Sequence, residues 1–179
     1  INKLSEDSLK MKYLNDLSYK SISRADSLFF RKVNHQTSTL ATKLNDSAAL
    51  AEAKWDLGIF LKDTGLKDST YFYYNQALAI YSKSLGNISN SMNEYQRAIE
   101  FYNNASEYLD SITSTESNRV SIINNIGVSY NYLENFEKAE QNFMEVVNSD
   151  SLKYKNPSFY AKALTNLANT KSELKRKED

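Results

Sequence analysis

The stretch from Val120 to Ser149 decides the fold, and it reads VSIINNIGVSYNYLENFEKAEQNFMEVVNS. In its first half, Ile123, Ile126 and Tyr130 follow one another at steps of three and four residues. Residues with this spacing lie on one face of an α-helix. The first half of the stretch therefore predicts an amphipathic helix.

A second helix is predicted in the other half of the same stretch. Asn135 stands where an N-cap is expected, because asparagine side chains accept hydrogen bonds from the first free backbone N–H groups of a helix. Phe136, Ala139, Phe143 and Val146 then make an apolar face. The stretch is therefore interpreted as two helices joined by a short turn.

The same pattern occurs a second time, between residues 51 and 84. Gly58 precedes the aromatic Tyr74 by sixteen residues, and Gly127 precedes Phe143 by the same interval. A residue without a bulky side chain lets two helix backbones approach closely. Two units with small residues in matching places indicate a repeat.

Both units resemble tetratricopeptide repeats, whose pattern is W-x2-L-G-x2-Y, then A-x3-F, then often P. The match departs from that pattern in places: Trp55 is one residue off, Thr70 replaces the usual Ala, and neither unit has the terminal Pro. The resemblance implies an all-α fold. It also implies a right-handed superhelix of antiparallel helix pairs, an α-solenoid of about nine helices.

One array over residues 1–179 is expected, with units at 6–44, 48–84, 86–113 and 118–149. In the third unit, the first helix is placed around Ile88, Met92 and Tyr95, where no small residue is found. Residues 88–112 form one helix or two, because no Gly or Pro separates them. A last helix over 157–175 starts at Asn156-Pro157. That helix either caps the array or belongs to a longer one.

The composition excludes several classes of protein. Only four glycines and one proline occur, so a turn-rich β fold is not expected. The 22 basic and 22 acidic residues balance, so no overall field favours nucleic acid. No apolar run is long enough to insert into a membrane. The compartment stays open between periplasm and cytoplasm, since the lack of cysteine fits either.

Catalytic and metal chemistry is not expected in this chain. His35 is the only histidine, and its polar neighbours predict an exposed position. Without cysteine or a second histidine, a zinc site has too few ligands. No glycine-rich phosphate loop is present. We therefore expect no enzyme activity and no cofactor.

The resemblance implies that the first helix of each pair lines a concave groove that binds a protein or peptide segment. The implied groove residues are rich in side-chain amides, which can pair with a peptide backbone. They are Asn15, Tyr19, Trp55, Ile59, Lys62, Asn90, Asn124, Val128, Asn131, Tyr132, Thr165 and Asn169. Related arrays clamp a C-terminal carboxylate with Lys or Arg. Here Trp55, Asn90 and Asn124 take those places, which disfavours such a clamp.

Two functions follow from the resemblance as expectations. The repeat lengths near 40 residues are similar to those in bacterial sensor kinases and transcriptional regulators, where the array is the regulatory or sensory part. The alternative is a structural scaffold that forms a homodimer or a larger complex through its helical edges. Fold alone does not choose between them.

Overall fold

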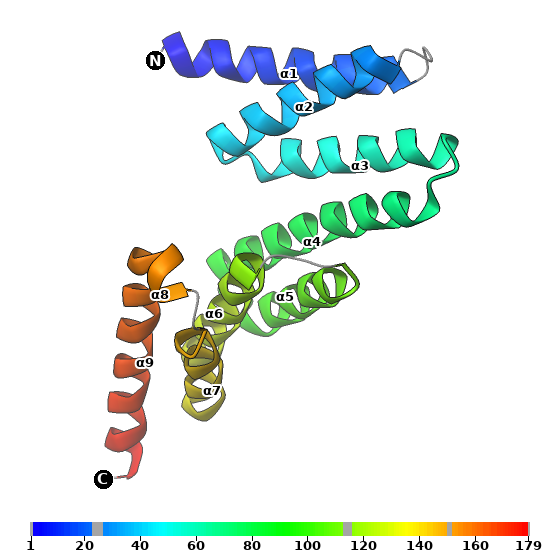
Figure 1. Ribbon diagram of the computed structural model, residues 1–179. Helices are drawn as coiled ribbons and strands as arrows, with labels where there is room; N and C mark the ends of the chain where they lie inside the picture. Colours follow the sequence, from blue (N-terminus) through cyan, green and yellow to red (C-terminus); the bar gives the residue numbers. More distant parts are fainter. Residues whose placement is uncertain (1, 23–26, 113–115, 150–151, 179) are drawn as a thin grey trace. The chain divides into compact units, whose positions relative to one another are not determined.

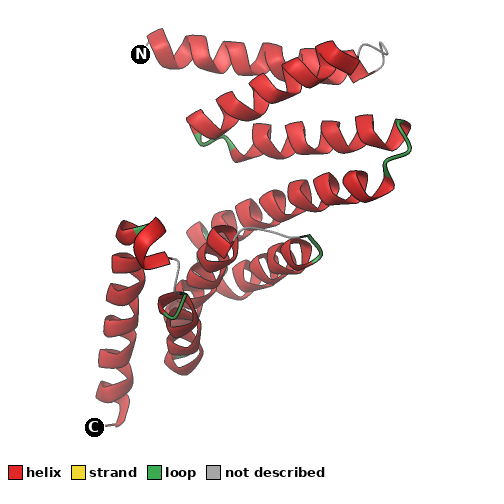
Figure 2. Cartoon of the chain, in the orientation of Figure 1, coloured by secondary structure: helices red, strands yellow, loops and turns green. Residues whose placement is uncertain are grey.

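The protein is described by a computed structural model that covers residues 2–22, 27–112, 116–149 and 152–178. These residues form nine α-helices and no strand (Figures 1 and 2). The helices are α1 (Asn2–Ile22), α2 (Ser27–Leu44), α3 (Ser47–Asp63), α4 (Lys67–Ser91), α5 (Tyr95–Asp110), α6 (Glu116–Tyr132), α7 (Phe136–Val147), α8 (Leu152–Lys155) and α9 (Pro157–Glu178). The expected all-α fold of packed helix pairs is confirmed.

The chain divides into two compact units, and the division lies inside α4. Unit 1 is Ile1–Tyr81, with α1, α2, α3 and the first part of α4. Unit 2 is Ser82–Asp179, with the last part of α4 and the helices α5 to α9. Helices that are adjacent in the sequence run antiparallel, as α2 and α3 do in unit 1 and α6 and α7 do in unit 2 (Figure 1).

The number of helices agrees with the expected one, but two helices differ from those expected. A single helix, α4, spans the second helix of one expected pair and the first helix of the next. The short α8, before Pro157, was not expected. No proline interrupts residues 79–83, so the helix propagates through them. The boundaries of the four expected units stay a prediction, and the end of the third, at residue 113, lies outside the described residues.

Residues 88–112 form two helices, because α4 ends at Ser91 and α5 begins at Tyr95. Between them Asn93 has a φ of 62°, in the left-handed region that asparagine tolerates better than most residues. The backbone N–H of Glu94 donates to the carbonyl of Ser89 at 2.9 Å, which closes a Schellman motif. The helix thus ends at an asparagine, without the glycine or proline that commonly ends a helix.

The same backbone stop recurs at the ends of three other helices. The residues with positive φ there are Asn45 at 55°, Gly65 at 78° and Glu134 at 55°. In each case the next residue donates its N–H to a carbonyl five residues earlier, at 2.9 to 3.3 Å. Each stop lets the chain reverse direction within a few residues, which produces the antiparallel pairs.

Three helices begin at a capping side chain. The side-chain oxygens of Asp46, Asn135 and Asn156 accept hydrogen bonds from the backbone N–H three residues later, at 3.0, 3.2 and 3.1 Å. Such caps satisfy donors that have no partner inside the helix. The starts predicted at Asn135 and at Asn156-Pro157 are therefore confirmed.

The core of unit 1 forms where the apolar faces of α1, α2 and α3 meet. The rings of Phe30 and Phe60 stack with centroids 4.5 Å apart. Burying a large apolar side chain of this kind contributes about 1.5 to 3 kcal/mol. A second cluster contains Met11, Leu14, Val33, Leu40, Ala41 and Ala49.

The core of unit 2 joins α6, α7 and α9. Its central cluster contains Val120, Ile123, Val146, Leu152 and Ala163. Leu152 comes from α8, so this short helix closes the cluster between α7 and α9.

Candidate binding faces of the first helices

In three places, a glycine on one helix packs against an aromatic ring of a neighbouring helix. The pairs are Gly58 with Tyr74, Gly86 with Tyr102, and Gly127 with Phe143. A Cβ atom added to any of these glycines would lie 2.5 to 2.8 Å from the ring. Real Cβ contacts of that length essentially do not occur, so each ring can lie where it does only because the glycine has no side chain.

The pair of Gly86 and Tyr102 corrects the sequence analysis. The middle first helix was placed around Ile88 and Met92 and said to lack a small residue, which is wrong. Gly86 is that residue, and it precedes Tyr102 by the sixteen residues that separate the other two pairs. The signal was present in the sequence but was obscured because this glycine lies inside a continuous helix.

Three side-chain contacts align the last part of α4 with α6. Lys83 Nζ donates to the hydroxyl of Ser121 at 2.9 Å, the Asn125 amide donates to Asn87 at 3.1 Å, and the Ser129 hydroxyl donates to Asn90 at 3.0 Å. The partners are 38, 38 and 39 residues apart. The end of α4 therefore acts as a first helix, with Lys83 and Asn87 added to the expected face beside Asn90.

A second set of contacts joins α6 to α9. Asn124 is only 2% exposed and accepts a hydrogen bond from the Asn166 amide at 3.3 Å. Asn131 donates to the Thr170 hydroxyl at 2.9 Å and accepts from it at 3.0 Å. Because buried polar groups need partners, these amides hold the first helices in register. The structure thus places Asn124 and Asn131 at helix contacts.

Other residues of the expected face in unit 2 are accessible. Tyr132 is 61% exposed, and its ring stacks on Tyr95 at 4.7 Å with an angle of 7° between the planes. Val128 is half-buried, whereas Thr165 and Asn169 are exposed. The accessible part of this face therefore combines aromatic, aliphatic and polar side chains.

The expected face of unit 1 is more aromatic. Trp55 is 41% exposed, and its ring centroid lies 4.6 Å from that of Tyr74. Tyr19 on α1 and Lys62 near the end of α3 are exposed, and Ile59 is half-buried. The two rings are tilted by 40°, and this contact holds the indole against a neighbouring helix while part of it stays accessible to a partner.

Two carboxylates near Trp55 on α3, those of Glu52 and Asp56, were not among the residues predicted from the sequence. The amide of Asn15 donates to Glu52 at 2.8 Å. Burial raises the pKa of Asp56, the hydroxyl of Ser18 lowers it, and repulsion by Glu52 raises it. Burial and the two carboxylates raise the pKa of Tyr81 as well. Glu52 and Asp56 are four residues apart on α3, so they lie on one face of that helix.

Comparison with known families decides what kind of repeat this is. Residues 120–151 match the family model of the tetratricopeptide repeat. These residues form a tetratricopeptide repeat. The match covers most of α6 and all of α7, the two helices that carry Gly127 and Phe143. The resemblance inferred from that stretch is confirmed, whereas no finding tests the likeness to sensor kinases or transcriptional regulators.

Comparison with solved structures finds a similar fold. The crystal structure of BtubC (BKLC) from P. vanneervenii matches 97% of this chain and 83% of its own, with a TM-score of 0.53 and 16% sequence identity. An identity that low supports similarity of fold and nothing beyond it. No curated protein matches this sequence.

Lys83 is a basic residue on the face where a carboxylate clamp would lie. In tetratricopeptide arrays with such a clamp, a basic residue stands on the groove. Trp55, Asn90 and Asn124 were assigned to the clamp positions from the sequence. Lys83 stands two residues before the observed Leu85-Gly86 pair, as Trp55 stands before Leu57-Gly58. Burial lowers the pKa of Lys83, and within the described ranges it has no ion pair with a carboxylate. Lys83 thus adds one basic residue to this face, and the expectation that a clamp is disfavoured stays a prediction.

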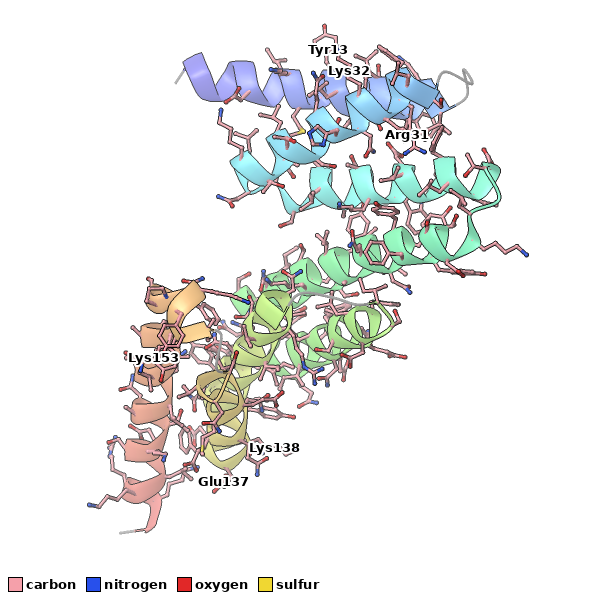
Figure 3. The ribbon with its side chains drawn as sticks, in the orientation of Figure 1. Tyr13, Arg31, Lys32, Glu137, Lys138 and Lys153 are labelled. Atoms are coloured by element: carbon pink, nitrogen blue, oxygen red, sulfur yellow. The ribbon has the colours of Figure 1, made fainter. Side chains whose placement is uncertain are left out.

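Metal binding by the described residues would require a cluster of side chains that could hold the ion. No group of three or more His, Cys, Asp or Glu side chains there could hold a metal ion. His35 is exposed, as expected. Glu137 and Lys138 on α7 are exposed (Figure 3), and Lys138 Nζ lies 5.2 Å from the centroid of the Tyr130 ring. Among the described residues, no helix is long and apolar enough to cross a membrane.

Proposed function

We propose that the chain binds a protein or peptide segment on the accessible face of its first helices. Tetratricopeptide repeats are protein-interaction modules, so the repeat at residues 120–151 makes this chain an interaction or scaffold module. Such repeats are typically non-catalytic. The remaining question is which surface a partner uses.

The observation that supports this face is the hydrogen-bonded alignment of three first helices in unit 2. The contacts from α4 to α6 and from α6 to α9 fix the helices before a partner arrives. A preorganised surface loses little conformational entropy on binding, which favours affinity. We therefore assign partner contact to the accessible residues Val128, Tyr132, Thr165 and Asn169.

The same reasoning assigns partner contact in unit 1 to exposed or half-buried side chains. They are Tyr19, Trp55, Ile59 and Lys62. Aromatic side chains dominate the binding energy of many interfaces, so Trp55 and Tyr132 are the expected anchors. The amides of Asn15, Asn90, Asn124 and Asn131 then support the face by joining helices.

Selection of short random peptides on the immobilised chain, followed by calorimetric titration, tests this proposal. Val128→Glu places a charge in the middle of the proposed face and should weaken a selected peptide by at least about tenfold. Met144→Glu on α7 is the matched control, since Met144 is also partly exposed but lies on a second helix. Equal binding by both variants would exclude this face.

Lys83 leads to a finer version of the proposal, in which it contacts an anionic group of the segment. Lys83→Gln removes the charge but keeps a donor for Ser121. The Lys83→Gln variant should bind peptides with an acidic group about tenfold more weakly. The control variant Lys138→Gln on α7 should bind these peptides with unchanged affinity. If the two variants bind alike, Lys83 serves only the helix contact.

We further propose that the module is the regulatory part of a larger bacterial signalling protein. The support is the similarity of its repeat lengths, near 40 residues, to those of such arrays. The complete reading frame tests this idea directly. A membrane segment or an output domain encoded in the same frame would support it, and a frame that encodes only this array would rule it out.

The alternative is a scaffold that assembles through its helical edges. Apolar side chains on the surface, such as Leu85 and Ile88 on α4 and Met92 in the turn after it, give that alternative a basis. Light scattering over a range of concentrations separates the two. A mass that stays at 20.5 kDa would argue against self-assembly.

A further inference from the structure

Unit 1 contains a polar cluster in which acceptors predominate and no cation is present. The cluster contains Asn15 and Ser18 from α1, and Glu52 and Asp56 from α3. No described lysine or arginine forms an ion pair with either carboxylate. Lys20 on α1 pairs with Asp16 at 2.6 Å. Lys54 on α3 lies over the ring of Tyr73.

Two buried oxygen atoms in this cluster have no hydrogen-bond partner. Ser18 is 0% exposed, and its hydroxyl makes no hydrogen bond of ordinary geometry within the described residues. The hydroxyl lies close enough to Asp56 to lower the pKa of that carboxyl group. The side-chain oxygen of Asn15 is also buried without a partner among the described residues. Leaving buried polar atoms unsatisfied costs about 1 to 3 kcal/mol each, so the cluster has hydrogen-bonding capacity that the described residues leave unused.

The side chains around the cluster favour an organic cation. Trp55 follows Glu52 by three residues on α3, so these two side chains lie on one face of the helix, and Trp55 is 41% exposed. The indole ring is the best aromatic partner for an ammonium or guanidinium group. Tyr81 lies near both carboxylates and adds a second aromatic side chain.

We infer that this cluster binds a lysine or arginine side chain of the partner segment. A guanidinium offers five N–H donors and an ammonium three, so either group has enough donors for both carboxylates. The inference rests on the proposed function, because it names the chemistry of a segment that this face would bind. A partner of unit 1 is then a basic segment.

The test measures binding of N-acetyl-arginine methylamide to the full chain by proton–nitrogen correlation spectra. Addition should shift the indole N–H signal of Trp55 and the side-chain amide signal of Asn15 in a saturable manner. N-acetyl-citrulline methylamide has nearly the same shape without the charge, and it should bind about tenfold more weakly or not at all. Equal shifts from both probes would overturn the inference.

Variants then assign the effect to the two carboxylates. Glu52→Gln combined with Asp56→Asn keeps the shape of the cluster and should weaken the arginine probe by at least about tenfold. Glu100→Gln combined with Glu107→Gln on α5 changes the net charge equally and should leave binding as it is. The first double variant should fold normally, because it removes a repulsive pair. Unchanged binding in that variant would contradict the inference.

The proposed function and this inference fail in different ways. If selected peptides bind but do not depend on Glu52 and Asp56, peptide binding stands and the basic partner is wrong. If the arginine probe binds as expected but no peptide is captured, the cation site stands and the proposed function is wrong. Calcium chloride is added as a competitor, and displacement of the probe at equal concentration would indicate a metal site instead.

Discussion

Tyr102 packs on Gly86 so closely that a Cβ atom on the glycine would lie 2.5 Å from Cε1 of the ring. The hydroxyl of the same tyrosine donates to Asn87 at 2.8 Å, and Asn87 also accepts from Asn125. One aromatic side chain on α5 thus contacts α4 directly and reaches α6 through Asn87. Both apolar packing and polar alignment in unit 2 depend on this position.

Gly86→Ala should destabilise the protein, against the usual trend. Alanine in a helix is normally about 1 kcal/mol better than glycine. Here the added methyl group meets the ring of Tyr102, so we expect a net loss of about 1 to 3 kcal/mol in the free energy of unfolding. Urea titration measures it. In a Tyr102→Leu background the same change should be neutral or stabilising, and an equal loss there would exclude the clash as the cause.

Gly127→Leu and Ala139→Leu should each cost about 1 to 3 kcal/mol by overpacking the contact between α6 and α7. A Cβ atom on Gly127 would lie 2.8 Å from the ring of Phe143, and Ala139 is fully buried. Ala168→Leu on α9 is the control, since Ala168 takes the same place after a leucine but is exposed. Thermal melts in which all three variants behave alike would refute the proposed packing.

Asn135→Ala should lower the free energy of unfolding by about 1 kcal/mol. The change removes the side chain that accepts from the backbone N–H of Lys138 at the start of α7. Glu94 occupies the equivalent place before α5 but forms no capping bond with its side chain. Glu94→Ala should therefore cost much less, and denaturant titration of both variants compares them directly.

The reciprocal pair of Asn131 and Thr170 should couple α6 to α9. Thr170→Val keeps the shape of the side chain but removes the hydroxyl, with an expected loss of about 0.5 to 1.5 kcal/mol. A double-mutant cycle with Asn131→Ala should give an interaction energy of similar size. Thr165→Val is the control, because the exposed Thr165 hydroxyl bonds only to its own helix. A coupling energy near zero would contradict the alignment of these helices.

Alkaline pH should destabilise the fold partly through Tyr102. Burial raises the pKa of this phenol from 10.0 to about 12 in the folded protein. Between those values the unfolded chain loses the proton more readily, so the stability contribution is complete below pH 10 and is lost as pH rises toward 12. Denaturant titrations at several pH values should show a smaller loss for Tyr102→Phe. Tyr154→Phe, at an exposed tyrosine, should follow the unchanged protein.

The sequence by itself determined the helical class, the helix pairs and two of the close glycine–aromatic contacts between helices. Scarcity of glycine and proline excluded a turn-rich fold, and a sixteen-residue interval identified Gly58 with Tyr74 and Gly127 with Phe143. These signals are local, because helix periodicity and capping depend on residues a few positions apart. The third pair, around Gly86, obeyed the same interval and was available to the same reasoning.

Only the tertiary structure decided what the polar side chains do. Asn124 and Asn131 were expected to meet a peptide, but their partners are 42 and 39 residues away on another helix. Glu52 and Asn15 likewise meet across 37 residues. Such contacts depend on how two helices slide and rotate against each other. That register is set by the packing of whole apolar faces and not by any short run of sequence.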